Sequence, residues 1–245
     1  MDRKDFTRHI SGALNQSLEE VFDHILKMGG MVEKQIDCAI EALQKSDKTL
    51  ANEVLNLDKD VNKQEVEVDT LCARIVARQQ PTALDLRLVL SAIRMAVDLE
   101  RMGDEAVKIA KFVLKMVERD LSCNQLPGLS HLIEISLRSS KMLRAVLDDF
   151  ARLNIEDAAK TIQEEEVLDE VYKNALQALE QDVMTVESEQ KVCVLELIFA
   201  LRAAERMSDH ARNIAESIIY LVTGHDVRDM KEEEIFAFLK EFEAE

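Results

Sequence analysis

Apolar residues recur at intervals of three and four along most of the chain. One stretch that shows this spacing contains Leu86, Val89, Leu90, Ile93 and Val97. The spacing gathers apolar side chains on one face of a helix, whereas a half-buried strand alternates with a period of two. The pattern therefore predicts long amphipathic helices rather than strands, and the predicted fold class is all-α.

The helical pattern is interrupted at several places. Short breaks fall at residues 46–47, 80–81, 154 and 187–189. The strongest break, at residues 121–128, contains Asn, Pro and Gly and lies almost midway along the 245 residues. We therefore predict two tandem three-helix bundles, residues 1–122 and residues 123–245, with a short additional helix near residues 231–242.

Two local features refine this picture. Gly29 and Gly30 lie inside the first predicted helix, where glycine lowers helix stability and usually marks a kink or the close approach of a neighbour. Pro81 is expected in the first turn of the third helix, because proline is tolerated there, with Asp85 near the positive end of the helix dipole.

An internal repeat supports the division into two units. Residues 99–110 align with residues 204–215, and Glu, Arg, Met, Asp, Ala, Ile and Ala recur in register. A weaker match aligns residues 58–62 with residues 165–169. Since a fixed internal repeat indicates that one structural unit is used twice, we interpret the chain as a tandem duplication.

The repeated helices carry paired carboxylates. Glu100 and Asp104 are four residues apart, as are Glu205 and Asp209, so each pair lies on one helix face. Both pairs fall in the stripe that also carries the apolar residues, and carboxylates aimed at a packed surface are costly unless a cation or proton accompanies them. These four residues are our main candidate metal ligands.

Further oxygen-bearing side chains are expected beside these pairs. The secondary candidates are Asp58, Asn62, Glu165, Asp169 and Asn213. A set of oxygen ligands suits hard cations, namely Mg²⁺, Mn²⁺, Ca²⁺ or ferric iron. Two alternatives remain open: Arg202 and Arg212 could neutralise the acids of the second unit without a metal, and Lys108, at the position of Asn213 in the first unit, could compete with a cation.

The charge restricts the classes of partner. A net charge of −17 opposes nucleic-acid binding, which depends on Lys and Arg neutralising phosphates, and opposes adhesion to anionic lipid. An acidic surface favours solubility, cation binding or a basic protein partner. The N-terminus is too polar for a signal peptide and no stretch approaches the about 20 apolar residues of a membrane span, so we expect a cytoplasmic protein.

The cysteines and histidines offer little chemistry. Cys38, Cys72, Cys123 and Cys193 are widely separated and form no C-x-x-C pair, so they are interpreted as small apolar fillers. The five histidines do not converge in the sequence, and we expect them, His210 included, at the surface or at helix ends.

Three kinds of function compete. No nucleophile–base pair and no phosphate-binding glycine loop is visible, and the Glu-x-x-His motif of di-iron bundles is absent from both acidic helices. A protein-binding adaptor is therefore favoured over an enzyme or an iron-storage protein. The third alternative is a plain helical scaffold with charged seams.

Longer motifs point to a family. Residues 28–33 read Met-Gly-Gly-Met-Val-Glu, residues 77–87 read Ala-Arg-Gln-Gln-Pro-Thr-Ala-Leu-Asp-Leu-Arg, and both acidic helices contain Glu-Arg-Met-x-Asp. With these motifs, their order and the duplication, the sequence resembles the PhoU family over nearly its whole length.

This resemblance implies several properties. It implies self-association, as a homodimer or higher oligomer, and binding of iron, manganese or magnesium at the acidic helices, with Glu100, Asp104, Glu205 and Asp209 as ligands. It also implies a functional turn at Asp85 and Arg87. The implied role is a non-enzymatic negative regulator that links the ATPase subunit of a phosphate ABC transporter to a sensor histidine kinase and keeps phosphate-starvation genes off. Such a protein would meet the membrane only through its partners.

Overall fold

The structure is a computed structural model that describes residues 5–6, 11–121, 126, 128–183 and 188–244. These residues form helices and connections, and no strand occurs among them. The helices are α1 (Gly12–Lys45), α2 (Lys48–Gln79), α3 (Ala83–Glu118), α4 (Leu129–Arg152), α5 (Ile155–Val183), α6 (Ser188–Thr223) and α7 (Glu232–Ala244). The predicted all-α fold of six long helices and a short C-terminal helix is confirmed.

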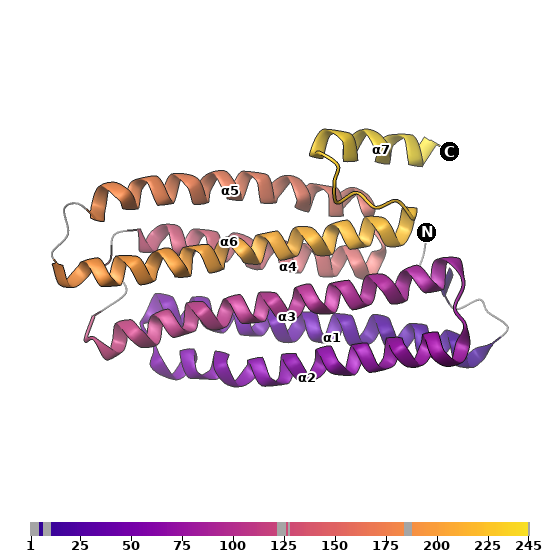
Figure 1. Cartoon of the computed structure of the whole chain (residues 1–245), viewed down its shortest axis with the longest axis horizontal. Coiled ribbons are helices and arrows are strands. Elements are labelled where there is room, and N and C mark those ends of the chain that lie inside the picture. The colour runs from indigo at the N-terminus through magenta and orange to yellow at the C-terminus, as the bar shows by residue number, and fades with distance from the viewer. Residues whose placement is uncertain (1–4, 7–10, 122–125, 127, 184–187, 245) are drawn as a thin grey trace.

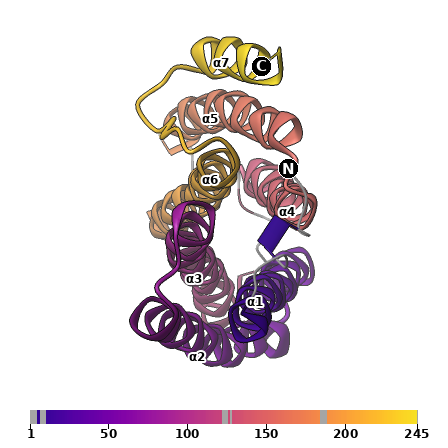
Figure 2. The ribbon, with the colours of Figure 1, turned by 90° about the vertical axis from the view of Figure 1, so that its right-hand side faces the viewer.

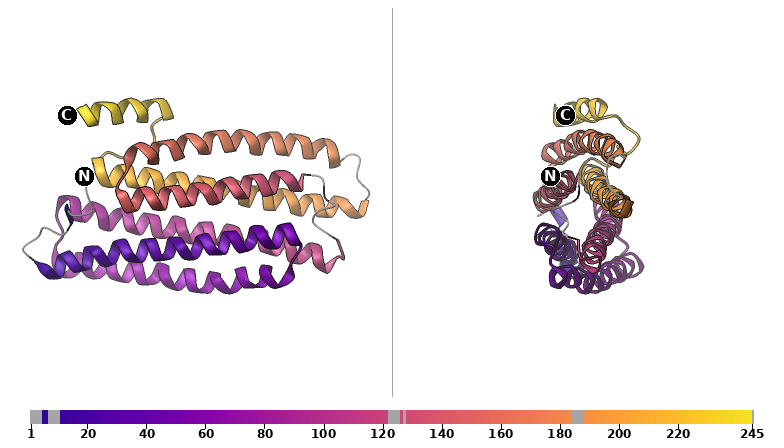
Figure 3. Two further views of the ribbon diagram at one scale, coloured as in Figure 1. Left: turned by 180° about the vertical axis from the view of Figure 1, so that it is seen from behind. Right: turned by 90° about the vertical axis from the view of Figure 1, so that its left-hand side faces the viewer.

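The six long helices run along the length of the molecule in two groups (Figure 1). Helices α1, α2 and α3 form one group and α4, α5 and α6 form the other, while α7 packs on α5. The groups meet where α3 packs along α6 and α1 packs along α4 (Figures 2 and 3). The seam between α3 and α6 is therefore the main junction of the molecule.

Side-chain caps explain where the helices begin. The carboxylate of Asp47 accepts hydrogen bonds from the backbone N–H groups of Thr49 (2.7 Å) and Leu50 (3.2 Å), which would otherwise lack partners at the start of α2. The side chain of Asn154 accepts from the N–H of Asp157 (3.2 Å) at the start of α5. The predicted breaks at residues 46–47 and 154 are thereby confirmed.

The other breaks are confirmed in part. Helix α2 ends at Gln79 and α3 begins at Ala83, so Pro81 precedes the N-cap residue Thr82 and does not lie in the first turn as expected; Asp85 does. Residues 122–125 and 127 of the central break, and residue 187 of the break before α6, lie outside the described part of the chain. Ser188 and Glu189, predicted as part of that break, instead belong to the first turn of α6.

Gly29 marks a close approach of two helices rather than a kink. Helix α1 continues through both glycines, and a Cβ atom at position 29 would overlap the side chain of Leu147 on α4. Nothing lies within 4 Å of the corresponding point at Gly30. The expected tight packing is confirmed at Gly29, where it lets α1 and α4 approach.

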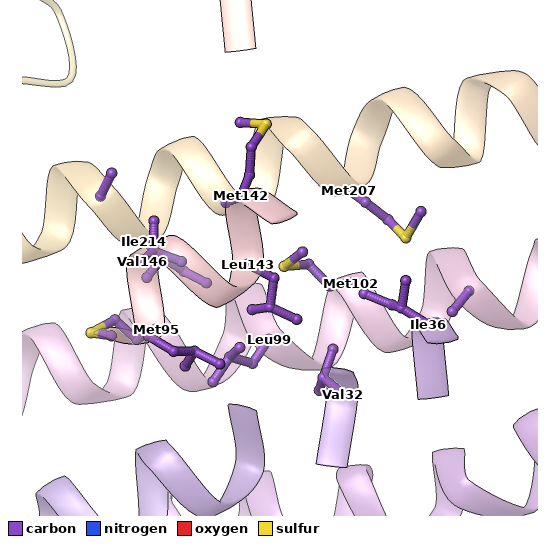
Figure 4. Packing of buried hydrophobic residues seen from close by; sticks show 14 of the residues in the cluster. Val32, Ile36, Met95, Leu99, Met102, Met142, Leu143, Val146, Met207 and Ile214 are labelled. Carbon is purple, nitrogen blue, oxygen red and sulfur yellow. The ribbon is translucent and has the colours of Figure 1, made fainter. Parts of the chain in front are cut away.

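One hydrophobic core runs through both groups of helices. Met102 of α3 and Met207 of α6, which are equivalent in the repeat, lie in this core beside residues of α1 and α4 (Figure 4).

Cys72 and Cys193 are buried and Cys38 is half-buried, whereas Cys123 lies outside the described residues. Burial raises the pKa of Cys72 to about 12, which keeps this thiol protonated and unreactive. No described helix combines the length and apolar character that crossing a bilayer requires.

Candidate functional site

The first acidic surface lies between α2 and α3. Glu100 of α3 is half-buried, and burial raises the pKa of its carboxyl group, with further increases from Asp104, Glu65 and Asp58. The negative charges of these carboxylates on α2 and α3 therefore repel one another. Asp104 is exposed, which corrects the expectation that both α3 acids face packed surface: the buried neighbour at this turn is Gly103. Asn62 is exposed beside this surface.

A buried amide holds this surface together. The side chain of Gln35 on α1 is fully buried and donates to Asp58 Oδ1 (3.0 Å) and to the carbonyl oxygen of Gly103 (3.2 Å). A Cβ atom at position 103 would lie 2.7 Å from Gln35 Oε1, so glycine leaves the room that the amide needs. Sequence reasoning missed Gln35, although the small residue inside Glu-Arg-Met-Gly-Asp was a signal of close packing.

The second acidic surface lies between α5 and α6. Glu205 is only 5% exposed; Arg202 donates to its Oε1 at 2.6 Å, while its Oε2 is buried without a hydrogen-bond partner among the described residues. Burial, followed by the charge of Asp209, raises the pKa of Glu205 to about 7, and Arg202 partly opposes the increase. Burial also raises the pKa of Asp209 and of Glu165.

Internal cations accompany the second surface. Arg212 contacts Glu165 at 2.6 Å and Glu216 at 3.1 Å, and Lys173 contacts Asp169 at 2.9 Å. With Arg202 at Glu205, each of these acids except Asp209 has a close basic partner. The first surface differs, because no ion pair within 4.0 Å reaches Glu100 or Asp104 from the rest of the described chain, and only the more distant charge of Arg101 lowers the pKa of Glu100.

Asn213 and Lys108, which were expected beside the acids, point elsewhere. Asn213 donates to Asp98 Oδ1 at 3.0 Å, and His210 Nδ1 lies 2.9 Å from the same oxygen, so both face α3 across the seam. His210 is 4% exposed, and its expected surface location is wrong because this side of α6 packs against α3. Lys108 pairs with Glu105 at 2.7 Å on the seam and does not compete for the first acidic surface.

The oxygen atoms of these surfaces are suitable ligands for a hard cation, but their arrangement is not. Carboxylate oxygens gather on the first surface, and the second contains an acceptor, Glu205 Oε2, that lacks a donor. Within the described residues, however, no three His, Cys, Asp or Glu side chains converge closely enough to hold a metal ion. Side chains would therefore have to rotate before they could coordinate a cation together.

The turn at Asp85 and Arg87 packs against the second unit. Asp85 is buried and Arg87 is half-buried at the start of α3, and Arg87 Nε has no hydrogen-bond partner in the described structure. The guanidinium group passes over Gly224, just after α6, where a Cβ atom would overlap it. This turn thus lies at one end of the α3–α6 seam.

Fold and surfaces together define a helical repeat protein with one carboxylate-bearing surface per unit. The sequence model of the PhoU domain matches residues 25–113 and again residues 132–218. The chain therefore belongs to the PhoU family.

Known relatives agree over nearly the full length. The chain is 42% identical over 231 residues to the "phosphate-specific transport system accessory protein PhoU homolog" of Pseudomonas putida, covering 94% of this chain and 88% of the relative. It is 38% identical over 235 residues to the Escherichia coli K12 "phosphate-specific transport system accessory protein PhoU", covering 96% and 95%. The crystal structure of PhoU from Pseudomonas aeruginosa superposes with a TM-score of 0.79 at 40% identity, covering 86% of this chain and 99% of that one.

Proposed function

We propose that this chain is a negative regulator of phosphate uptake and of phosphate-starvation signalling, which acts by binding other proteins rather than by catalytic turnover. The supporting observation is the 38% identity, over 96% of the chain, to a curated accessory protein of a phosphate-specific transport system. A solved relative from Streptococcus pneumoniae, 30% identical with a TM-score of 0.78, is titled a phosphate transport system regulatory protein.

The proposed partners are the ATPase subunit of a phosphate ABC transporter and the cytoplasmic part of a sensor histidine kinase. In this proposal the protein is cytoplasmic, associates with itself as a homodimer or higher oligomer, and meets the membrane only through these partners. Its long, well-packed helices offer extended faces for docking, and its charge of −17 favours basic patches on the partners.

A hard cation would act as a structural or regulatory ligand in this proposal. The first acidic surface is the better candidate, because Glu100 and Asp104 lack close basic partners within the described chain while Arg202 and Arg212 already accompany the second surface. Glu100, Asp104, Asp58 and Glu65 would supply oxygens to Mn²⁺, Mg²⁺ or iron. The cation would remove the repulsion that contributes to the raised pKa of Glu100.

The test combines a genetic and a binding measurement. The chain is expressed in a bacterium that lacks its own PhoU and carries a phosphate-starvation reporter, and the purified chain is titrated with the ATPase subunit and the kinase's cytoplasmic region. We expect the reporter to be silent in high phosphate and both partners to bind at low salt. A reporter that stays active while neither partner binds would refute the proposal.

A further inference from the structure

Two grooves line the seam between α3 and α6. Both helices contain 36 residues and run in opposite directions, and the correspondence of Glu100 with Glu205 extends along them. The first groove, of about 340 Å³, is named the Arg94 groove and is lined by Ile93, Arg94, Val97, Asp98, Arg101, Asn213, Ser217 and Arg228. The second, of about 320 Å³, is named the Phe199 groove and is formed by α3 residues 105–115 and α6 residues 196–206.

The two grooves are repeat equivalents. Arg94 corresponds to Phe199, Arg101 to Arg206 and Asn213 to Lys108 under the alignment of the two helices. The duplication has therefore produced the same concave site twice, once near each end of the seam. Residues that differ between the two grooves therefore indicate which kind of segment binds in each groove.

The Arg94 groove receives a segment of the chain itself. After α6, Arg228 lines the groove, and the carboxylate of Asp226 lies 3.9 Å from Arg94 and 2.8 Å from Arg228 Nε. Val227, which lies between Asp226 and Arg228 in the sequence, is fully buried. The chain thus places a carboxylate beside two arginines at this end of the seam.

The Phe199 groove has no such cover among the described residues, because only α3 and α6 line it. Phe199 is 70% exposed, and Leu195 and Val192 are also exposed. The three residues lie at intervals of three and four and therefore share one face of α6. Apolar side chains gathered on one exposed helix face indicate an interaction surface rather than the scattered single residues of an ordinary exterior.

The charge around Phe199 is opposite in sign to that of the chain. The groove carries five basic residues, Lys108, Lys111, Lys115, Arg202 and Arg206, and two acidic ones, Glu105 and Glu196. Glu105 is buried beneath Lys108 (2.7 Å) and Arg206 (3.3 Å), Lys115 contacts Glu196 at 2.6 Å, and Arg202 contacts Glu205, outside the groove, at 2.6 Å. Lys111 has no ion-pair partner in the described residues. On a protein with a net charge of −17, this local basic excess favours an acidic occupant.

We propose that the Phe199 groove docks an acidic segment of a partner protein, with an apolar side chain beside its carboxylates. At the equivalent Arg94 groove, the chain itself places the carboxylate of Asp226 beside two arginines. The proposal rests on the proposed function in one respect: the partner is one of the two proteins named there. Phe199 is the apolar anchor, since aromatic residues at the centre of an interface contribute most of its binding energy. The lysines and arginines around it attract and orient the acidic segment.

The test measures binding of the ATPase subunit and of the kinase's cytoplasmic region to the parent, Phe199→Ser and Lys111→Glu. Matched controls are Val66→Ser and Lys63→Glu on α2, where Val66 is 62% exposed and the Lys63 side chain 76% exposed. We expect Phe199→Ser to weaken binding of one partner by at least about tenfold. Lys111→Glu should weaken the same complex and reduce its salt dependence, while both controls bind as the parent does.

Each other outcome overturns the proposal in a recognisable way. If the parent binds a partner and both groove variants bind it equally well, the groove is not the docking surface, although the proposed function stands. If the parent binds neither partner, the proposed function fails and the docking proposal fails with it. If Phe199→Ser instead lowers the solution mass from that of an oligomer to that of a monomer and leaves partner binding intact, the groove joins two copies of this chain. Because Phe199 is exposed, an unchanged melting temperature should verify that the variants fold.

Discussion

At the scale of single residues, Glu205 is unusual because its buried carboxylate is only partly hydrogen-bonded. One oxygen of its carboxylate accepts from Arg202, and the other is buried without a donor in the described structure. A buried acceptor without a partner destabilises the folded state, more so when it is charged. The carboxyl group can relieve this cost by taking up a proton.

Glu205 should therefore make the folded chain less stable as the pH rises. The pKa of an unfolded glutamate is about 4.3, and that of folded Glu205 is about 7. Between these values the folded state binds more protons, so stability falls with rising pH, and the loss is complete above pH 7. Between pH 5 and pH 8, Glu205→Gln should remove about 1–3 kcal/mol of this loss.

Urea denaturation of both proteins at each pH would measure this difference. Glu134→Gln, which alters an exposed carboxylate on α4, serves as the control and should follow the parent. Parallel pH profiles for the parent and Glu205→Gln would contradict the assignment of this pH dependence to Glu205.

A second prediction at this scale concerns Gly103. Because a Cβ atom there would lie 2.7 Å from Gln35 Oε1, Gly103→Ala should displace the amide and break its hydrogen bonds to Asp58 and Gly103. We expect a loss of about 1–3 kcal/mol, the usual cost of a buried polar group left without a partner. Gly30→Ala, where nothing lies within 4 Å, should instead stabilise the helix by about 0.5–1 kcal/mol. Equal effects of the two substitutions on the free energy of unfolding would be inconsistent with this role for Gly103.

At the scale of helices, the sequence predicted the positions of the individual helices well, but it predicted the contacts between residues of different helices poorly. The period of apolar residues and the breaks at residues 46–47 and 154 located the helices, because these signals are local. The same spacing placed Asn213 beside Asp209 but could not reveal that its face of α6 meets Asp98 of α3. Contacts across helices depend on how each helix is rotated in the bundle, and a one-helix pattern does not contain that information.

The difference between the two acidic surfaces leads to a prediction about cations. Mn²⁺ should raise the melting temperature of the parent, and the increase should vanish in Glu100→Gln/Asp104→Asn, because the first surface lacks close internal counter-ions. A cation at a hundred times its dissociation constant adds about 2.7 kcal/mol if the unfolded chain does not bind it. Thermal melts with Mn²⁺ and after chelation would measure this increment.

The matched variant is Glu205→Gln/Asp209→Asn. It should keep the Mn²⁺ response, since Arg202 and Arg212 already accompany the second surface. If the second pair abolishes the response and the first pair does not, the assignment of the cation to the first surface is wrong.

At the scale of the whole molecule, the two units share one interior. Leu99 and Met102 of α3 pack with Met207 and Ile214 of α6 (Figure 4). The internal repeat predicted two units but could not show that their cores are continuous. Apolar residues that pack inside one unit have the same sequence pattern as apolar residues that pack against the other unit. That distinction requires the packed structure.

A shared interior predicts one cooperative unfolding transition. Hydrogen exchange followed by mass spectrometry should show that α1–α3 and α4–α6 lose protection at the same urea concentration, because separation of the units exposes the seam residues. Two transitions, with one group of helices protected after the other has opened, would show that the units fold independently.

The pairing of α3 with α6 also has a consequence for how this architecture can diversify. In a symmetric dimer of identical three-helix chains, every substitution appears in both copies at once. Fusion of the two copies into one polypeptide removes that constraint: Phe199 stands where the other copy has Arg94, and Asn213 stands where it has Lys108. The seam thereby acquires two unlike ends, the Arg94 groove near one and the Phe199 groove near the other, so a ligand can distinguish the two ends of a molecule built from one repeated unit.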